Sequence, residues 1–210
     1  MMLVSGSAYF AVNELAYRRG VTVFDPAQVF VVEGRTLDSR IPYLPWTILV
    51  YHGLFELLLC LPFLTYPKTS SGARDLFRLY EGQFVLTLIA CAVFLIAPAE
   101  MALRVPAEQH GDSVVDQLNL LVHVQDRPFN TWPSLHVAWT CLATLQVTRW
   151  IRSRRRKILL WACFVVVAIS TLTVKQHYLW DVISAALLAL GYWRWKLRKP
   201  TSGSSEPAQA

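Results

Sequence analysis

Apolar residues are grouped along this chain in long runs that short polar segments separate. Each run approaches the roughly 20 residues that an α-helix needs to cross the hydrocarbon core of a bilayer. Five runs predict spanning helices, at residues 43–66, 83–98, 134–151, 158–174 and 178–195. A sixth run, residues 1–17, is shorter and contains Asn13 and Glu14, which fits a tilted span, a trimmed span or an interfacial helix. We interpret it as a span, because six crossings leave both termini on one side.

Composition agrees with this all-α, polytopic membrane bundle of about six transmembrane helices. Of the 210 residues, 54% are hydrophobic and only 16% are charged, which is unusual for a soluble globule. We predict one transmembrane domain over residues 1–199. Residues 200–210 are rich in Ser, Gly, Pro and Ala and have little to bury, so they predict a disordered tail.

Charge orients the predicted bundle. The formal net charge is +6, and the basic residues lie between apolar runs, where they indicate topology and contacts with anionic lipid head groups rather than with nucleic acid. The clusters are Lys68, Arg74 and Arg78, residues 149–157 and residues 194–199. The positive-inside rule makes these regions cytoplasmic, which predicts a multi-pass cell-membrane protein with both termini in the cytoplasm. Arg18 and Arg19 would then lie outside, against the rule.

The long loop at residues 99–133 is predicted to lie on the non-cytoplasmic face. Within it, Val114, Val115, Leu118, Leu121 and Val122 recur at helical spacing. Ser113 and Asp116, three residues apart, are typical of a capping box at a helix start. The loop therefore predicts a short amphipathic helix, either lying on the membrane at the mouth of a site or packed on the bundle.

The run at residues 134–151 opens with Pro133-Ser134-Leu135-His136. Asn130 or Thr131 can cap this helix, and Pro133 suits its first turn because no amide donor is lost there. The start of a helix binds anions through free backbone N–H groups and the helix dipole. Ser134 adds a hydroxyl, and His136 is placed to donate a proton to a leaving oxygen.

A second polar pair, His177 and Asp181, opens the last run. Four residues apart on a helix, the two side chains share a face, so the carboxylate can accept the imidazole N–H and fix its tautomer. Such an imidazole can attack phosphorus and form a phosphohistidine. Both motifs emerge on the predicted non-cytoplasmic face, where His177 and His136 would bracket one phosphoryl group. The alternative interpretation is a chance P-S-x-H sequence and a polar pair that joins two helices.

His52 and Glu56 are a further ionisable pair, near the middle of the first long run. Ionisable residues inside a membrane are functional candidates by default. We favour a structural interpretation, in which the pair links helices or lines the lower part of a cavity.

These motifs resemble those of the type 2 phosphatidic acid phosphatase superfamily, which read K-x6-R-P, P-S-G-H and S-R-x5-H-x3-D. The resemblance covers Arg127-Pro128, Pro133 to His136, and Ser170 with His177 and Asp181. It implies that His177 is the nucleophile, Asp181 its orienting partner and His136 the general acid. It also implies an enzyme that needs no metal and no cofactor.

The same resemblance implies a set of phosphate ligands, Arg127, Ser134 and Ser170. Two cations of the family pattern are replaced, because Leu120 stands where the family has Lys and Thr171 where it has Arg. Lys175 can take over part of this role.

The Gln176-His177-Tyr178 segment with Asp181 is similar to the branch that includes inositol phosphorylceramide synthases, which transfer phosphoinositol between lipids. A diester head group carries less charge than a terminal phosphate, which fits the loss of two cations. We therefore expect a lipid phosphatase or head-group phosphotransferase that acts on a membrane phospholipid, sphingolipid or isoprenoid phosphate at the non-cytoplasmic face. Two alternatives are a non-catalytic lipid-binding protein with the same fold and a haem protein that uses His136 and His177 as axial ligands.

Overall fold

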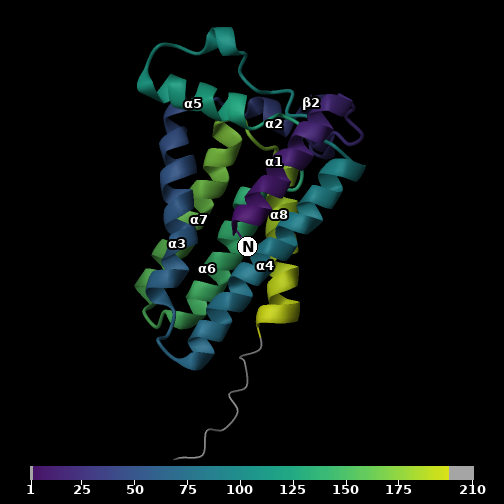
Figure 1. The fold of residues 1–210 in the computed structure, drawn as a ribbon. Coiled ribbons are helices and arrows are strands. Elements are labelled where there is room, and N and C mark those ends of the chain that lie inside the picture. The colour runs from purple at the N-terminus through teal and green to yellow at the C-terminus, as the bar shows by residue number, and fades with distance from the viewer. Residues whose placement is uncertain (1, 199–210) are drawn as a thin grey trace, which may run out of the picture.

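The computed structural model describes residues 2–198 as a bundle of helices, so the tail predicted at residues 200–210 lies outside the described residues. Figure 1 shows long helices that run along the molecule, the N-terminal one tilted against the others, and α5 lying across one end, which we call the α5 end. The long helices are α1 (Met2–Arg19), α3 (Phe55–Thr65), α4 (Ser70–Ile96), α6 (Leu135–Trp150), α7 (Arg154–Thr173) and α8 (Leu179–Tyr192).

A helix lies in each of the six predicted apolar runs, which confirms the all-α membrane bundle. Among the described residues, three segments are long and apolar enough to cross a membrane: Pro45–Thr65, Ser70–Ile96 and Arg154–Thr173. α6 and α8 have 16 and 14 residues, below a full crossing as regular α-helices. The number of six crossings therefore stays a prediction.

The start of α4 differs from the prediction, which placed it at residue 83. The helix begins at Ser70, where the side chain of Thr69 accepts a hydrogen bond from the Gly72 amide. Helical structure continues into the polar residues before the apolar run, because a capped start satisfies the first amides in water. Hydropathy marks the buried part of this helix and misses its polar beginning.

The segment before α3 is irregular. A 3₁₀ turn (Pro45–Thr47) leads into a π-helical turn (Val50–Leu54), which continues directly into α3. π-helical turns are rare and frequently occur at functional sites. This one places Tyr51, which is 1% exposed, against the interior of the bundle.

α6 is the central helix of the bundle and packs against α3, α4, α7 and α8. Small residues allow close approach: a side chain at Gly82 of α4 would meet the Tyr192 ring of α8 at 2.6 Å. Val137 and Leu142 of α6 are fully buried in the largest apolar cluster, together with Ala185 and Ala189 of α8. The core therefore fixes where the first residues of α6 and α8 meet at the α5 end.

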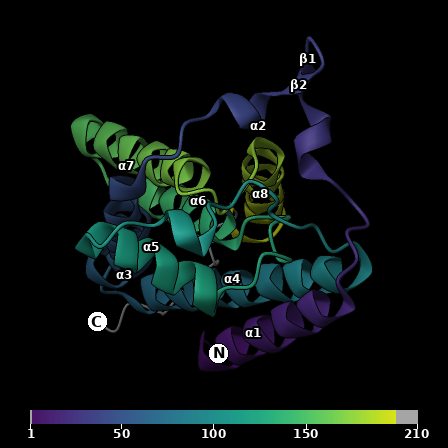
Figure 2. The same cartoon turned by 90° about the horizontal axis from the view of Figure 1, so that it is seen from above.

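Residues 20–44, which we call the N-terminal strap, cross the α5 end beside α8. The strap contains a 3₁₀ turn (Pro26–Val29), the short antiparallel strands β1 (Val31–Val32) and β2 (Arg35–Thr36), and α2 (Leu37–Arg40). Figure 2 shows it looping from α1 past α8 to α2. Asp38 attaches the strap to α8, because its Oδ1 accepts a hydrogen bond from the Leu179 amide at 2.7 Å.

The amphipathic helix predicted in the long loop is confirmed as α5 (Val114–Gln125). Ser113 caps it and accepts a hydrogen bond from the Asp116 amide at 3.2 Å. Val115, Leu118 and Val122 pack on Ile48, Tyr51 and Val174 of the bundle. Val114 and Leu121 are 77% and 50% exposed, so α5 also presents an apolar surface outwards.

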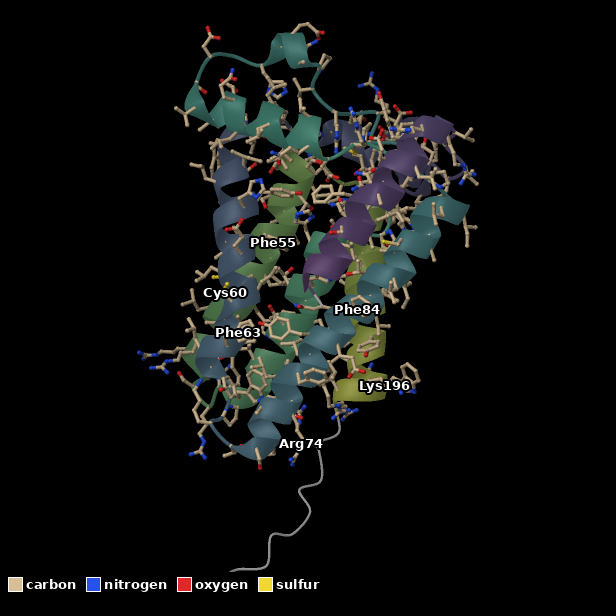
Figure 3. All side chains as sticks on the ribbon, in the orientation of Figure 1. Phe55, Cys60, Phe63, Arg74, Phe84 and Lys196 are labelled. Atoms are coloured by element: carbon tan, nitrogen blue, oxygen red, sulfur yellow. The ribbon has the colours of Figure 1, made fainter. Side chains whose placement is uncertain are left out.

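Basic residues gather at the end of the molecule opposite α5. Figure 3 labels Arg74 and Lys196 there, and α7 begins there with its run of basic residues from Arg154. The predicted cytoplasmic clusters thus share one end. The apolar spans indicate association with a membrane, and the assignment of its two faces stays a prediction.

Candidate active site

His177 lies in the tight turn between α7 and α8, at the α5 end. The amides of Gln176 and His177 both donate to the carbonyl oxygen of Thr171, at 3.1 and 3.2 Å. Lys175 adopts a left-handed backbone conformation with φ of 57°, which is uncommon for a residue other than glycine. Such conformations persist where surrounding contacts hold them, and they cluster at functional sites. The turn therefore presents His177 from a rigid support.

A backbone carbonyl orients the His177 ring. Its Nδ1 lies 2.8 Å from the carbonyl oxygen of Thr131, which can only accept a hydrogen bond. Nδ1 therefore carries the proton and Nε2 keeps its lone pair. The side chain is 7% exposed, so few water molecules compete for this contact.

Asp181 has a different geometry from the expected one. Its Oδ2 lies 3.7 Å from His177 Nδ1, beyond hydrogen-bond distance, and instead accepts from the Tyr178 amide at 2.7 Å. The carboxylate caps the first turn of α8, and the Thr131 carbonyl accepts the hydrogen bond from the imidazole N–H in its place. Asp181 therefore supports the turn that holds His177, with its carboxyl group close to the ring.

His136 faces this turn from the beginning of α6. Its ring centroid lies 5.8 Å from that of His177, so the two histidines meet as predicted from opposite sides of one site. The His136 ring packs between Tyr51 and Phe55, with centroids at 4.5 and 4.6 Å. The Tyr51 hydroxyl lies 3.3 Å from His136 Nδ1.

The cap of α6 is Ser134, whose hydroxyl accepts from the Val137 amide at 3.3 Å. The expectation that Asn130 or Thr131 would cap the helix, with Pro133 in its first turn, was wrong. Serine is a strong capping residue, and the Thr131 hydroxyl is used elsewhere, donating to the Ala99 carbonyl at 3.0 Å. The backbone amide of Ser134 also donates to the carbonyl oxygen of Asp181, at 3.4 Å, which joins the two motifs.

The other three predicted phosphate ligands have partners of their own. Arg127 Nε lies 3.2 Å from Glu14 Oε2, and its guanidinium covers the Tyr17 ring. Lys175 donates through Nζ to carbonyl oxygens of the strap, at 3.2 Å from Asp38 and 2.6 Å from Ile41. The Ser170 hydroxyl donates to the Val167 carbonyl at 2.7 Å, within α7. Their predicted role in binding phosphate stays a prediction.

The sequence argument missed Arg104. Its Nη2 donates to Gln176 Oε1 at 2.6 Å, one residue before His177. Its positive charge helps to lower the pKa of His177, so the guanidinium acts on the site directly. The signal was available in the sequence, because Arg104 and Arg127 are the only Lys or Arg residues between positions 99 and 133.

A second missed residue is Asp126, at the end of α5. Its carboxylate accepts hydrogen bonds from the Tyr9 hydroxyl at 2.9 Å, from Asn13 at 2.8 Å and from Asn130 at 2.7 Å. Burial raises the pKa of Asp126, and the nearby charge of Arg104 opposes that effect. Asn13, which made the first apolar run weak, is thus a partner of a buried carboxyl group rather than a defect in the helix.

Burial also sets the protonation of His177. It lowers the pKa of the imidazole to about 4, although the hydrogen bond to Thr131 and the charge of Asp126 favour the protonated form. His177 is consequently neutral at neutral pH. A neutral imidazole with its proton on Nδ1 has a free Nε2 lone pair, as a nucleophile requires.

A cavity of about 260 Å³ adjoins His136. Its walls come from Tyr9 and Phe10 of α1, Phe55 of α3 and Trp139 of α6. His52 also lines it, and His52 Nδ1 lies 3.9 Å from Glu56 Oε1 with both side chains largely exposed. The structure therefore supports the cavity-lining interpretation for His52, whereas Glu56 lies beyond the wall.

The model of the PAP2 superfamily matches residues 42–195, which include His136, His177, Asp181 and Arg104 and leave out α1 and almost all of the strap. No curated protein matches this chain.

Proposed function

The chain belongs to the PAP2 superfamily of lipid phosphatase-type proteins, and from this premise we propose that it transfers the phosphoryl group of a membrane lipid through a covalent intermediate on His177. The observation that carries the proposal is the pair of imidazole rings 5.8 Å apart, one of which has its tautomer fixed by a backbone carbonyl. That separation lets one phosphoryl group contact both rings.

In the first step, the lone pair on His177 Nε2 forms a bond to phosphorus, and the bond between phosphorus and the lipid oxygen breaks. The negative charge of the bound phosphate favours the imidazolium form of the buried His136. The leaving oxygen takes a proton from Nε2 of this imidazolium. In that state His136 Nδ1 also carries a proton, and this N–H donates a hydrogen bond to the Tyr51 oxygen, 3.3 Å away. Tyr51 thereby positions His136 so that Nε2 is the nitrogen that exchanges a proton with the substrate.

In the second step, the oxygen of water or of a lipid hydroxyl attacks phosphorus and the bond to His177 breaks. His136 Nε2 takes the proton of the attacking group, which restores the imidazolium. Water gives inorganic phosphate from a monoester, whereas a lipid hydroxyl accepts the phosphoryl head group. The phosphorylated His177 ring is cationic, and Asp181 and the Thr131 carbonyl stabilise it from the Nδ1 side.

Positive charge supports the phosphate in both steps. Arg104 supplies a guanidinium held beside His177 by Gln176, and the positive end of the α6 dipole, capped by Ser134, faces the same region. Arg127 and Lys175 bind phosphate in this scheme only after they leave Glu14 and the strap carbonyls.

The site is proposed to open on the non-cytoplasmic face. The grouping of basic residues at the end opposite α5 supports this orientation through the positive-inside rule. The substrate is a phospholipid, sphingolipid or isoprenoid phosphate, and transfer to a second lipid, similar to that of inositol phosphorylceramide synthases, is the finer form of the proposal.

The decisive experiment compares the purified wild-type protein with His177→Ala and Tyr51→Phe on lipid substrates labelled with ³²P. The wild type should acquire an acid-labile, alkali-stable label and turn the lipid over, and His177→Ala should do neither. Tyr51→Phe should form the label more slowly and shift the pH dependence of kcat. His110→Ala, a histidine of the long loop, is the matched control and should keep full activity.

Retained turnover in His177→Ala would overturn the mechanism. Lipid mass spectrometry then separates the two outcomes of the second step, since hydrolysis gives a dephosphorylated lipid and transfer gives a lipid with a new head group. Binding of phospholipid without any turnover would favour the alternative of a non-catalytic lipid-binding protein.

A further inference from the structure

We propose that the cavity beside His136 binds a hydrocarbon chain of the lipid that is attacked, and that this chain enters sideways between α1 and the π-helical turn. The inference rests on the proposed function, because it takes His136 as the polar end of the substrate site. The cavity is then a subsite for the hydrocarbon chain, and its wall residues determine which chains bind.

The walls of the cavity suit a hydrocarbon chain. Tyr9 and Phe10 of α1 stand opposite Phe55 of α3, and Leu135 and Trp139 of α6 form the base. His136 lies at the polar end, where its ring contacts Phe55 at a centroid distance of 4.6 Å. A lipid whose phosphate is between His136 and His177 therefore has an apolar channel directly adjacent to its ester oxygen.

The cavity reaches the surface on the side of the bundle. Phe10 is 53% exposed and the side chain of His52 is 46% exposed, and both line it. Val122 and Gln125 of α5, with Asp126 directly after it, line the cavity towards the α5 end. Figure 3 labels Phe55 next to α3, and Phe55 lines the cavity together with Tyr9 and Phe10 of α1. An opening between helices below α5 admits a chain from the bilayer without passage through water.

Packing explains why the opening lies there. α1 packs on α4, while α3 packs on α6, so the cavity lies between two pairs of helices. In a bilayer the lipid tails are as apolar as the cavity wall, so entry gains little from the hydrophobic effect. The cavity must therefore select chains by shape, and its wall residues should change discrimination between substrates.

α1 is the part of this wall that lies outside the matched residues 42–195, and it contributes Gly6 to the lining. A Cβ atom added at Gly6 would meet no atom within 4 Å, and Gly6 lines the cavity. A larger residue there can occupy the cavity without displacing protein atoms. It should also favour the helix, because glycine is a poor helix former.

The test compares Gly6→Phe with Gly191→Phe in the full-length protein in detergent micelles. Gly191, in α8, likewise has no atom within 4 Å of an added side chain and does not line the cavity, so it is a matched control. The substrates are hexadecyl phosphate and butyl phosphate, which share a head group. Gly6→Phe should lower kcat/KM for hexadecyl phosphate by about tenfold or more and leave butyl phosphate unchanged. Gly191→Phe should change neither.

Equal kcat/KM values of Gly6→Phe and wild type for hexadecyl phosphate would overturn the proposal, and so would equal losses on both substrates. The rate at which His177 is labelled shows whether the cavity holds the chain of the donor lipid. With hexadecyl phosphate, this rate should be lower in Gly6→Phe than in the wild type. If only the second step is slower in Gly6→Phe, the cavity binds an acceptor lipid, which contradicts the proposal.

A second measurement reads binding without turnover. Hexadecyl phosphate with a photoreactive diazirine at the chain end should crosslink to α1 or α3 in the His177→Ala variant, and Gly6→Phe combined with it should lose these crosslinks. Crosslinks confined to α7 or α8 would overturn the chain site. If the wild-type protein crosslinks at α1 or α3 but His177 never acquires the ³²P label, the proposed function is contradicted and the chain-binding site is still supported.

Discussion

His177 owes its tautomer to the carbonyl of Thr131, although the spacing of the motif pointed to Asp181. The spacing of four residues does bring Asp181 to the same side of the turn, 3.7 Å from the ring. At the start of a helix, however, a carboxylate finds a nearer donor in a backbone amide, and Asp181 binds that of Tyr178. Residue spacing therefore predicted the neighbours correctly and their hydrogen bonds incorrectly.

The protonation of His177 gives a prediction of pH dependence. Burial favours the neutral imidazole, so His177 should remain unprotonated as the pH falls from 7 and take up a proton only near its pKa of about 4. The nucleophile is lost as the pH falls through that value. The measurement is a ¹³C NMR titration of histidine-labelled protein in micelles, with His177→Gln to assign the signal. A midpoint near the ordinary value of about 6.5 would contradict the buried, neutral nucleophile.

The two arginines of the long loop should differ in their effect on catalysis. Arg104→Gln should lower kcat/KM by about 100-fold, because it removes a charged donor held beside the reacting group. Arg127→Gln should have a much smaller effect, because Arg127 is partly exposed and pairs with Glu14. Both variants are compared in kcat/KM and in thermal unfolding. A larger loss of kcat/KM in Arg127→Gln than in Arg104→Gln would indicate that Arg127 makes the main phosphate contact.

At the scale of elements, the N-terminal strap stabilises the turn that carries His177. Asp38 binds the first turn of α8 through its side chain, and its own carbonyl and that of Ile41 hold Lys175 in the strained turn. Nothing in the strap sequence indicates this role, because Asp38 and Leu179 are far apart in the chain. The contact exists only because the strap folds back over α8.

Substitutions at Asp38 test this role. Asp38→Ala leaves the partly buried Leu179 amide without an acceptor, which should destabilise the protein by about 1–3 kcal/mol and lower kcat. Asp38→Asn should be close to wild type, because its side-chain oxygen still accepts and because burial, which raises the pKa of Asp38, already penalises the charge. Thermal unfolding and kcat are measured together.

The control for Asp38 is Ser153→Ala, which removes an exposed helix cap at the start of α7. It should lower stability by about 1 kcal/mol without a change in kcat. If Asp38→Ala likewise loses stability but keeps the kcat of the wild type, the strap is a structural element alone.

At the scale of the whole molecule, the bundle places its proposed site and its basic clusters at opposite ends. Arg18 and Arg19 lie at the α5 end and are the exceptions. Arg18 pairs with Glu14 at 2.9 Å, and Arg19 donates to the Leu95 carbonyl near the end of α4. Both are therefore held by contacts within the α5 end.

Cysteine labelling tests the orientation in intact cells. In a Cys60→Ser background, a membrane-impermeant maleimide should label Glu108→Cys, in the exposed loop of the α5 end, without permeabilisation. Arg155→Cys, at the exposed start of α7, should be labelled only after permeabilisation. The opposite pattern would place the proposed site on the cytoplasmic face.

The sequence by itself determined the helices, their apolar character and the three residues of the catalytic hypothesis. Runs of apolar residues are a local property, and a helix satisfies its own backbone hydrogen bonds inside a membrane, so hydropathy was sufficient to find them. Motif spacing was sufficient to place His136 and His177 at the ends of two helices.

Only the tertiary structure decided which groups complete the site. Arg104, the Thr131 carbonyl, Asp126 and the wall of α1 come from segments far apart in the chain, and helix packing alone brings them together. Packing depends on the shapes of all facing side chains at once, and no short pattern in the sequence records it. The catalytic hypothesis therefore came from local residues, whereas the hydrogen-bond partners and the charged groups around His177 came only from the packing of the helices.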